Sequence, residues 1–332
     1  MLRFALFGAG RIGRMHADNL AAHPGAELAY VYDVVSDSAN DCAKRHGATA
    51  ASSIDDALND KTVDAVLVAS STDTHVDLIG AAARAGKAIL CEKPVDLDMA
   101  RVDRCWNEIK GLDPRVMIGF NRRFDPSFKA VHDGIRSGEI GELRQLIITS
   151  RDPEVPPVAY MKVAGGLLRD MTIHDFDLAR YMLGEEPVKV TCFANALIAQ
   201  EVRDLNDHDT AMILLETASG AQCCINNYRK AVYGYDQRVE AIGATGMLKA
   251  ENRRGTAVER WNAEHTAARD PVLYFFIERY REAYNAEIQA FIDAVEKGSA
   301  MPVSFEDGRR ALALANAAYD SLHSGKVVEI GA

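Results

Sequence analysis

The stretch "FGAGRIG", residues 7–13, decides the fold of this 332-residue chain. It sets Gly8, Gly10 and Gly13 in a G-x-G-x-x-G pattern, between an apolar run and a helical pattern. Gly8 permits a tight turn, Gly10 lets a pyrophosphate approach the backbone, and Gly13 lets the helix pack closely on a sheet. The helix would begin at Arg11 and Ile12, where free N–H groups attract phosphates. The stretch therefore predicts a dinucleotide-binding turn.

Outward from this turn, β-rich runs alternate with helical patterns as far as about residue 120. We expect strands in 3–8, 26–33, 63–70, 87–94 and 115–120. We expect helices in 12–25, 36–47, 75–86 and 99–111. Repeated strand–helix alternation implies right-handed crossovers and a doubly wound parallel sheet.

Asp33 ends the second strand, 20 residues beyond Gly13. Its carboxylate would accept hydrogen bonds from a ribose hydroxyl pair and would repel a 2′-phosphate. The following "VVSDS" offers no Arg or Lys to bind such a phosphate. The predicted cofactor is therefore NAD. The alternative is a glycine turn without a ligand, with Asp33 acting as a helix cap.

Two further turns end strands of the same predicted sheet. "ASSTDTHVD" follows the third strand and brings Ser71, Thr72 and His75 to the edge where open α/β sheets bind ligands. Capping of the next helix is an alternative for this turn. "CEKP" closes the fourth strand and delivers Glu92 and Lys93 to that edge. All five residues are candidate cofactor contacts.

The regular alternation of strands and helices ends after about residue 120. We expect helices near 126–137, 170–183, 273–297 and 305–324. Strand-like runs near 144–152, 188–198, 209–220, 221–232 and 236–246 have few helices between them, which predicts a mixed or antiparallel sheet. The predicted domains are a Rossmann domain, 1–121, and an α+β domain, 122–332.

The segment "GGLLRDMTIHDFDLARYMLG", 165–184, spaces Asp170, His174 and Asp177 by four and three residues. In a continuous helix these side chains share one face, with Asp175 on another side. His174 could take a proton near neutral pH, and Asp170 could orient its ring. A surface ion pair and a metal site are the alternatives. Since no second well-placed histidine is present, we expect no metal.

The composition restricts the classes of binding partner that we expect for this chain. The net charge is −10, which disfavours nucleic acid and anionic membrane surfaces. No apolar run approaches the ~18 residues of a membrane span, and the apolar N-terminal run is too short for a signal peptide. Six cysteines without C-x-x-C spacing predict reduced core thiols and a cytoplasmic protein.

Taken together, G-x-G-x-x-G, Asp33, "EKP" and D-x-x-x-H resemble the Gfo/Idh/MocA oxidoreductase family along essentially the whole chain. "NRRFDPSF", "SRDPEVPP", "HDFD" and "YGYDQR" resemble its bacterial inositol 2-dehydrogenases most. The resemblance implies NAD-dependent oxidation of a myo-inositol hydroxyl to a keto-inositol, and dimers or tetramers formed through the C-terminal sheet. It implies catalytic roles for Lys93, Asp170 and His174. The implied substrate contacts are these three with Arg122, Asp152, Asp177 and Tyr235.

The predicted substrate contacts and the substrate itself have alternative interpretations. Arg122 and Arg123 could pair with Asp125 or Glu139, and Tyr235 could simply pack on a neighbouring strand. The substrate could instead be scyllo- or chiro-inositol or a pyranose sugar. A non-catalytic NAD sensor would be expected to lack Lys93 or His174, and the chain has both.

Overall fold

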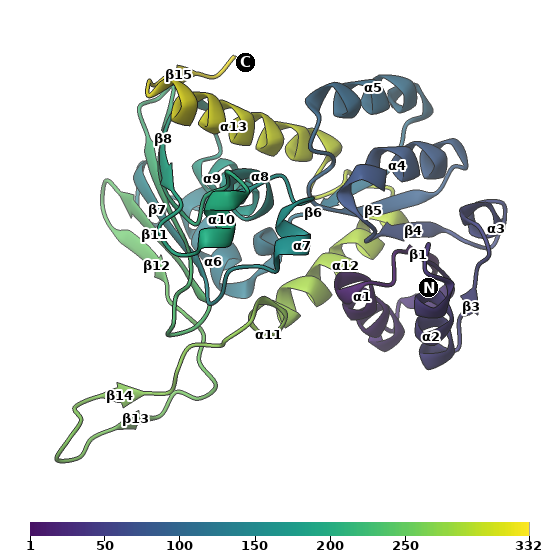
Figure 1. The fold of residues 1–332 in the computed structure, drawn as a ribbon, viewed down its shortest axis with the longest axis horizontal. Helices are drawn as coiled ribbons and strands as arrows, with labels where there is room; N and C mark the ends of the chain where they lie inside the picture. The colour runs from purple at the N-terminus through teal and green to yellow at the C-terminus, as the bar shows by residue number, and fades with distance from the viewer. Residues whose placement is uncertain (332) are drawn as a thin grey trace. The chain divides into compact units, whose positions relative to one another are not determined.

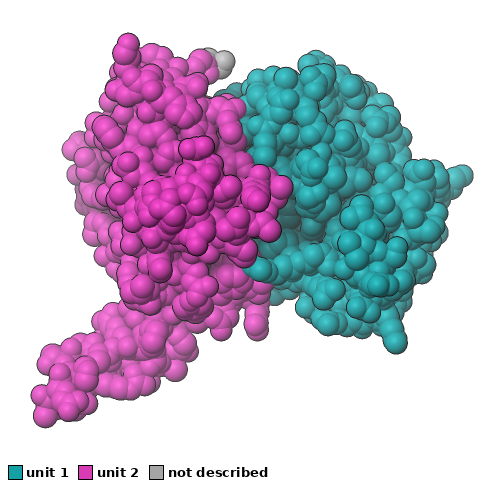
Figure 2. All heavy atoms as spheres, in the orientation of Figure 1, with its two compact units in different colours: residues 1–121, 283–312 teal, residues 122–282, 313–332 magenta. Residues whose placement is uncertain are grey.

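The computed structural model describes residues 1–331, which divide into two compact units. Unit 1 comprises residues 1–121 and 283–312, and unit 2 comprises 122–282 and the residues from 313 onward. Figure 2 colours them separately. The sequence-based division also falls after residue 121, but it assigned 283–312 to the second domain. Those residues group with unit 1, because their apolar side chains pack on its core, as Phe291 does on Phe4 and Phe305 on Trp106.

Unit 1 is built on the predicted parallel sheet, whose strand order among the described residues is β3-β2-β1-β4-β5-β6. Its strands are β1 (Leu2–Phe7), β2 (Ala26–Tyr32), β3 (Thr49–Ala50), β4 (Ala65–Val68), β5 (Ala88–Glu92) and β6 (Val116–Gly119). Its helices are α1 (Arg11–Ala22), α2 (Ser36–His46), α3 (Ile54–Leu58), α4 (His75–Arg84) and α5 (Met99–Ile109), with short η1 (Thr72–Thr74) and η2 (Lys110–Leu112). Figure 1 labels β1, β3, β4, β5 and β6 of this sheet and the helices α1 to α5.

The order of the central strands explains where unit 1 can bind a ligand. Phe7 pairs with Tyr32 on one side and with Val68 on the other, and Val68 pairs with Cys91. The carboxyl ends of β1, β2, β4 and β5 therefore lie at one edge. The apolar strands β1 and β4 are almost completely buried, as two-sided strands of a parallel sheet should be.

Unit 2 is built on a mixed sheet, whose strand order among the described residues is β12-β11-β7-β10-β9-β8-β15. Its strands are β7 (Leu143–Asp152), β8 (Pro187–Asn195), β9 (Thr210–Thr217), β10 (Gln222–Arg229), β11 (Asp236–Gly243), β12 (Met247–Ala250) and β15 (Val328–Glu329). The pair β10–β7 is parallel, whereas β10–β9 and β11–β7 are antiparallel. The predicted mixed sheet is thus confirmed.

The remaining elements belong mostly to unit 2, apart from the helix over 281–297, which lies almost wholly in unit 1, and the helix over 305–324, which has residues in both units. They are η3 (Asn121–Phe124), α6 (Pro126–Arg136), α7 (Val158–Met161), α8 (Leu167–Asp170), α9 (Thr172–Leu183), α10 (Gln200–Asp204), α11 (Phe276–Arg279), α12 (Arg281–Lys297) and α13 (Phe305–Ser324). Strands β13 (Glu259–Arg260) and β14 (Ala268–Arg269) form a hairpin that projects from unit 2 (Figure 1). No helix within residues 1–331 is long and apolar enough to cross a bilayer.

Candidate active site

The glycine turn links β1 to α1 and has the geometry that its sequence predicts. Gly8 has φ +99°, and a Cβ there would lie 2.5 Å from the Ala69 carbonyl oxygen. A Cβ at Gly13 would lie 1.9 Å from the Gly8 oxygen, so both positions require glycine. At Gly10 a Cβ would meet nothing within 4 Å, and Gly10 brings no side chain to cap α1. The turn thus leaves open space beside the N-terminus of α1, which fits a pyrophosphate.

Asp33 directly follows β2 and supports this turn. Its Oδ2 accepts a hydrogen bond from the Ala9 N–H at 2.6 Å, and its Oδ1 accepts one from the Val35 N–H at 2.8 Å. Asp33 is only partly buried, so its carboxylate can still accept from a ribose hydroxyl. The acid therefore fixes the glycine turn and presents negative charge at the same point.

The three predicted cofactor contacts in the turn after β4 differ in how deeply they are buried. Ser71 is exposed and Thr72 is half-buried, so both can meet a ligand at the sheet edge. The ring of His75 is buried, with Nδ1 2.8 Å from the Pro94 oxygen and Nε2 3.2 Å from the Ser70 oxygen. Burial lowers the pKa of His75. The prediction of a direct His75–cofactor contact is therefore corrected: the ring holds two loops together.

The segment after β5 carries Glu92 and Lys93. Glu92 ends the strand, and its Oε1 lies 2.7 Å from His16 Nε2 on α1. This bond ties the helix of the glycine turn to the strand that ends before Lys93. Lys93 is half-buried and follows at the same edge, where its ammonium can donate hydrogen bonds to a reacting oxygen.

In unit 2, the predicted helix over 170–183 is interrupted, which is a correction. Asp170 is the last residue of α8, Met171 lies between, and His174 and Asp177 belong to α9. The helical-face argument assumed one continuous helix. Asp170 is nevertheless held firmly, because its Oδ1 accepts from the Tyr160 hydroxyl at 2.6 Å and its Oδ2 pairs with the Arg229 guanidinium. His174 is half-buried on the first turn of α9.

Arg229 also approaches a second carboxylate. Asp152 ends β7 opposite Arg229 in the parallel register, and its Oδ2 lies 3.9 Å from Arg229 Nε. Burial and the charge of Asp170 raise the pKa of Asp152 to about 6, although Arg229 opposes the shift. Two carboxylates around one guanidinium thus give unit 2 one acid that titrates near neutral pH.

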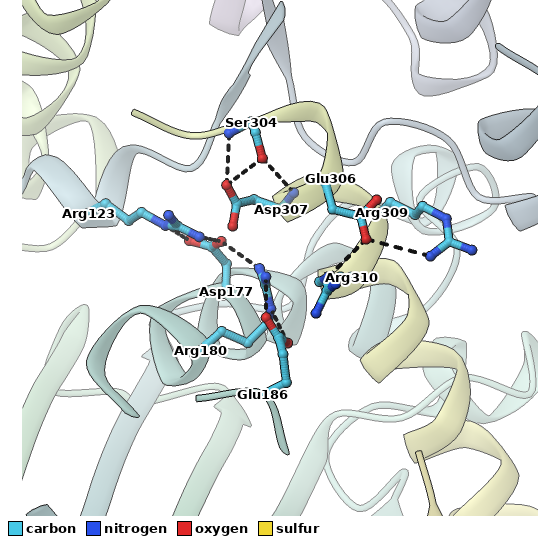
Figure 3. A network of polar contacts seen from close by, with 9 residues as sticks. All are labelled: Arg123, Asp177, Arg180, Glu186, Ser304, Glu306, Asp307, Arg309 and Arg310. Atoms are coloured by element: carbon cyan, nitrogen blue, oxygen red, sulfur yellow. Dashed lines mark hydrogen bonds and ion pairs between the residues drawn. The ribbon is translucent and has the colours of Figure 1, made fainter. Parts of the chain in front are cut away.

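Two arginines on η3 form buried ion pairs with the acids of α9. Arg122 pairs with Asp175 and also donates to the Ser150 hydroxyl at 3.2 Å. Arg123 binds both oxygens of Asp177, with Nε 2.8 Å from Oδ2 (Figure 3). The alternative partners Asp125 and Glu139 are therefore wrong for these two guanidinium groups. Asp125 instead pairs with Arg279.

These pairs alter two predicted substrate contacts. Asp177 is 1% exposed and receives Arg123 and, at 3.7 Å, Arg180, so its substrate role remains a proposal. Figure 3 also shows Arg180 bound to Glu186 and, within unit 1, the Ser304–Asp307 and Glu306–Arg309 contacts. Arg122 is 3% exposed and engaged by Asp175, so its substrate role remains a proposal.

Tyr235 directly precedes β11 and contacts the same aromatic ring as Arg122. Its ring meets Tyr280 edge-on at 5.9 Å, and Tyr280 lies under the Arg122 guanidinium. Burial raises the pKa of Tyr235 well above its usual value, so the hydroxyl is a neutral donor. Packing on a neighbour, the plainer interpretation, is thus seen, and a substrate contact remains proposed.

Sequence reasoning missed Tyr160, Arg229 and Asn227. Arg229 and Asn227 occupy alternate inward positions of β10, and Asn227 donates to Asp175 at 2.8 Å. Polar residues at buried positions of an otherwise apolar strand were the available signal. Tyr160 had no such signal, because its helix α7 has only four residues. No group of three or more possible metal ligands is found within residues 1–331.

The geometry thus gives unit 1 a glycine turn that fits a pyrophosphate, and unit 2 a cluster in which Arg229 lies between Asp170 and Asp152. Residues 2–120 match the family described as "Oxidoreductase family, NAD-binding Rossmann fold", and residues 128–249 match the "GFO/IDH/MocA C-terminal domain". The chain belongs to the Gfo/Idh/MocA family of oxidoreductases.

Three relatives place it within the family. It is 47% identical to the inositol 2-dehydrogenase of Rhizobium meliloti (strain 1021), over 99% of both chains. Its structure is similar to that of the myo-inositol dehydrogenase of Corynebacterium glutamicum, with TM-score 0.97, 44% identity and coverage of 100% and 99%. The Lactobacillus casei myo-inositol dehydrogenase, solved with NAD(H) and myo-inositol, gives TM-score 0.89 at 27% identity, covering 100% and 97%.

Proposed function

We propose that this protein oxidises a secondary hydroxyl of myo-inositol to a keto-inositol, 2-keto-myo-inositol, with NAD as hydride acceptor. The observation that carries the proposal is the 47% identity to an inositol 2-dehydrogenase along 99% of both chains. Lys93, Asp170 and His174, the residues to which the family resemblance assigns the chemistry, are all present. The glycine turn supports the cofactor, since Gly8 and Gly13 are sterically required and Gly10 leaves open space.

Each residue has a defined task in this proposal. His174 takes the proton of the reacting hydroxyl, because an imidazole has a pKa near working pH. Asp170, held by Tyr160 and Arg229, supplies the negative charge that stabilises the imidazolium. Lys93 donates to the same substrate oxygen as its negative charge develops. NAD, when bound, accepts the hydride from the carbon. Asp33 excludes a 2′-phosphate and so favours NAD over NADP.

The substrate contacts in the proposal are Lys93, Arg122, Asp152, Asp170, His174, Asp177 and Tyr235. The carboxylates suit a polyol, because charged acceptors form the stronger hydrogen bonds with hydroxyl groups. Asp152 is the candidate that best distinguishes inositol stereoisomers, since it is 24% exposed and can be protonated or charged near neutral pH.

The test follows NADH absorbance when the protein meets NAD and a panel of inositol isomers and pyranose sugars. We expect the highest kcat/KM with myo-inositol. His174→Ala should lower kcat by roughly 10²–10⁴, the usual contribution of a positioned acid–base group, while NAD still binds. His265→Ala, in the exposed hairpin, is the matched control and should behave as wild type. A higher kcat/KM with scyllo-inositol or a sugar would overturn the substrate, and full activity of His174→Ala would overturn the base.

The proposal extends to assembly and location. Phe193, Met212 and Leu214 lie on β8 and β9 and are all more than half exposed, which leaves an apolar face on the unit 2 sheet. Exposed apolar faces of this kind are typical of subunit interfaces. A homo-oligomer, a dimer or a tetramer, formed through this sheet would cover it. All six cysteines are unpaired, which supports a cytoplasmic location.

A further inference from the structure

The short helix that ends at Asp170 begins without a cap of its own. The N-cap residue of α8 is Gly166, which has φ +83° and no side chain that could accept from the first amides of the helix. The first N–H groups of any helix need a partner from outside the helix. α8 has only four residues, and helices of this length are not stable on their own. The position of Asp170 therefore depends on contacts made from other segments.

Asp207, in the loop between α10 and β9, supplies the missing cap. Its Oδ1 accepts a hydrogen bond from the Leu167 N–H at 2.9 Å, although 40 residues separate the two in the sequence. The same oxygen accepts from the His208 N–H at 2.7 Å, which orients the carboxylate. The Asp207 side chain is 8% exposed, and its Oδ2 has no hydrogen-bond partner among residues 1–331. Capping by Asp207 therefore depends on Oδ1.

Tyr319 on α13 adds a second contact at the beginning of α8. Its hydroxyl accepts from the Leu168 N–H and donates to the Gly165 carbonyl oxygen, both at 3.4 Å. Burial raises the pKa of Tyr319 to about 12, so the hydroxyl keeps the proton that it donates. A Cβ at Gly166 would collide with this hydroxyl and would lie 2.9 Å from Asp207 Oδ1. Glycine at position 166 is therefore what lets both side chains reach α8.

The loop that carries Asp207 is also bound to the partner of Asp170. The Arg229 N–H donates to the Asp209 carbonyl oxygen at 2.8 Å, and the Arg229 guanidinium pairs with Asp170. Asp209 is itself fixed, because its carboxylate accepts from the Leu197 N–H at 2.8 Å. One loop thus holds both the helix on which Asp170 lies and the strand residue whose guanidinium Asp170 binds.

We propose that Asp207 is a positioning residue for Asp170: by capping α8 from a distant loop, it holds the Asp170 carboxylate where it can stabilise the His174 imidazolium. The proposal rests on the proposed function, because it assumes that His174 is the base. Asp207 acts through the α8 backbone, without a contact to substrate or cofactor. A neutral asparagine can do the same, since its Oδ1 also accepts and its amide group would replace the unpartnered Oδ2.

The experiment measures kcat/KM for myo-inositol against pH, at saturating NAD, in wild type and three variants of Asp207. Asp207→Ala removes the cap and should lower kcat/KM roughly tenfold or more, the usual scale of a lost hydrogen bond to a charged group. The rise of kcat/KM that reports His174 deprotonation should also move to lower pH, because a displaced Asp170 carboxylate stabilises the imidazolium less. The dissociation constant of NAD should stay unchanged.

The other two variants separate position from charge. Asp207→Asn keeps the accepting Oδ1 and removes the charge, and should retain the wild-type rate and pH profile. Asp207→Glu keeps the charge but displaces the accepting oxygens by one methylene group, and should behave like alanine; it remains available if the alanine variant does not fold. Asp98→Ala, which removes the N-cap of α5 in unit 1, is the matched control and should leave the pH profile unchanged.

Hydrogen exchange followed by mass spectrometry gives a readout that does not need turnover. Peptides that cover residues 165–171 should exchange faster in Asp207→Ala and Asp207→Glu, and as in wild type in Asp207→Asn. A wild-type pH profile in Asp207→Ala, an asparagine variant that behaves like alanine, or unchanged exchange over 165–171 would each overturn the proposal. Failure of the proposed function would appear separately, as wild type that forms no NADH from myo-inositol while the exchange differences persist.

Discussion

Asp152 is the residue whose protonation is expected to change within the working pH range. Burial and Asp170 raise its pKa to about 6, from an ordinary value near 4. The folded protein therefore holds the Asp152 proton more tightly than the unfolded chain does. For an acid, this shift favours folding below the unfolded pKa, and that contribution is lost as the pH rises through about 6.

From the direction of this pKa shift we predict two effects of Asp152→Asn. The variant should gain melting temperature relative to wild type between pH 4 and 7, since it removes an acid that ionises unfavourably when folded. The KM for myo-inositol should fall in wild type as the pH rises through about 6, and this dependence should vanish in Asp152→Asn. Glu154→Gln, an exposed acid two residues away, is the control. An unchanged KM profile in Asp152→Asn would remove Asp152 from the substrate site.

Tyr160 tests how firmly Asp170 must be held. Its hydroxyl donates to Asp170 at 2.6 Å, and burial with the Asp170 charge raises its pKa, so it stays protonated. Tyr160→Phe should lower kcat/KM about tenfold or more, as loss of a hydrogen bond to a charged group usually costs about 1.5–3 kcal/mol. Tyr274→Phe is the matched control, because Tyr274 donates to the exposed Glu154. Comparable kinetics for both variants would contradict a positioning role.

At the scale of elements, two glycines of the turn before α1 are expected to have different tasks. Gly13 is needed for folding, and Gly10 is needed for cofactor binding. A Cβ at Gly13 would collide with the Gly8 carbonyl at 1.9 Å, whereas one at Gly10 meets open space. We predict that Gly13→Ala lowers the melting temperature markedly. Gly10→Ala should keep the wild-type melting temperature and lose NAD affinity, because its methyl group would occupy the space left for the pyrophosphate. Calorimetry with and without NAD measures both, and normal NAD affinity of Gly10→Ala would contradict this assignment.

The helices and strands also show which parts of the fold the sequence patterns predict. Apolar runs and glycine spacing correctly predicted β1, β2, β4, β5, β6 and the long strands of unit 2, because burial on two faces or on one determines those patterns. The patterns did not predict the break at Met171, or the division of 273–297 into α11 and α12. Residues at both breaks keep helical periodicity, so the pattern alone contains no sign of an interruption.

The candidate site was predicted unevenly for a related reason. The glycine turn and Asp33 depend on local backbone geometry, which sequence spacing encodes. The partners of Asp175 and Asp177 arrive from distant segments, and helical spacing cannot show that Arg122 and Arg123 reach them. Spacing placed Asp177 on the same face as His174, but it could not show that Asp177 also pairs with Arg123.

At the scale of the whole molecule, the apolar face of the unit 2 sheet should govern assembly. Leu214→Asp places a charge among Met212 and Phe193, where a partner sheet would have to desolvate it. We predict a smaller species by light scattering after size exclusion, with an unchanged circular dichroism spectrum. Leu112→Asp, at a leucine of similar exposure on unit 1, should leave the mass as in wild type. An unchanged mass for Leu214→Asp would exclude this face as the interface.

The chain passes between the two units three times, after residues 121, 282 and 312. During synthesis the first 121 residues emerge early, yet Phe291 and Glu287 follow more than 160 residues later. Domains generally fold as units while the chain grows. Here the nascent nucleotide-binding unit must wait, with Phe4 and Trp106 still lacking their aromatic partners, until residues 283–312 have been translated.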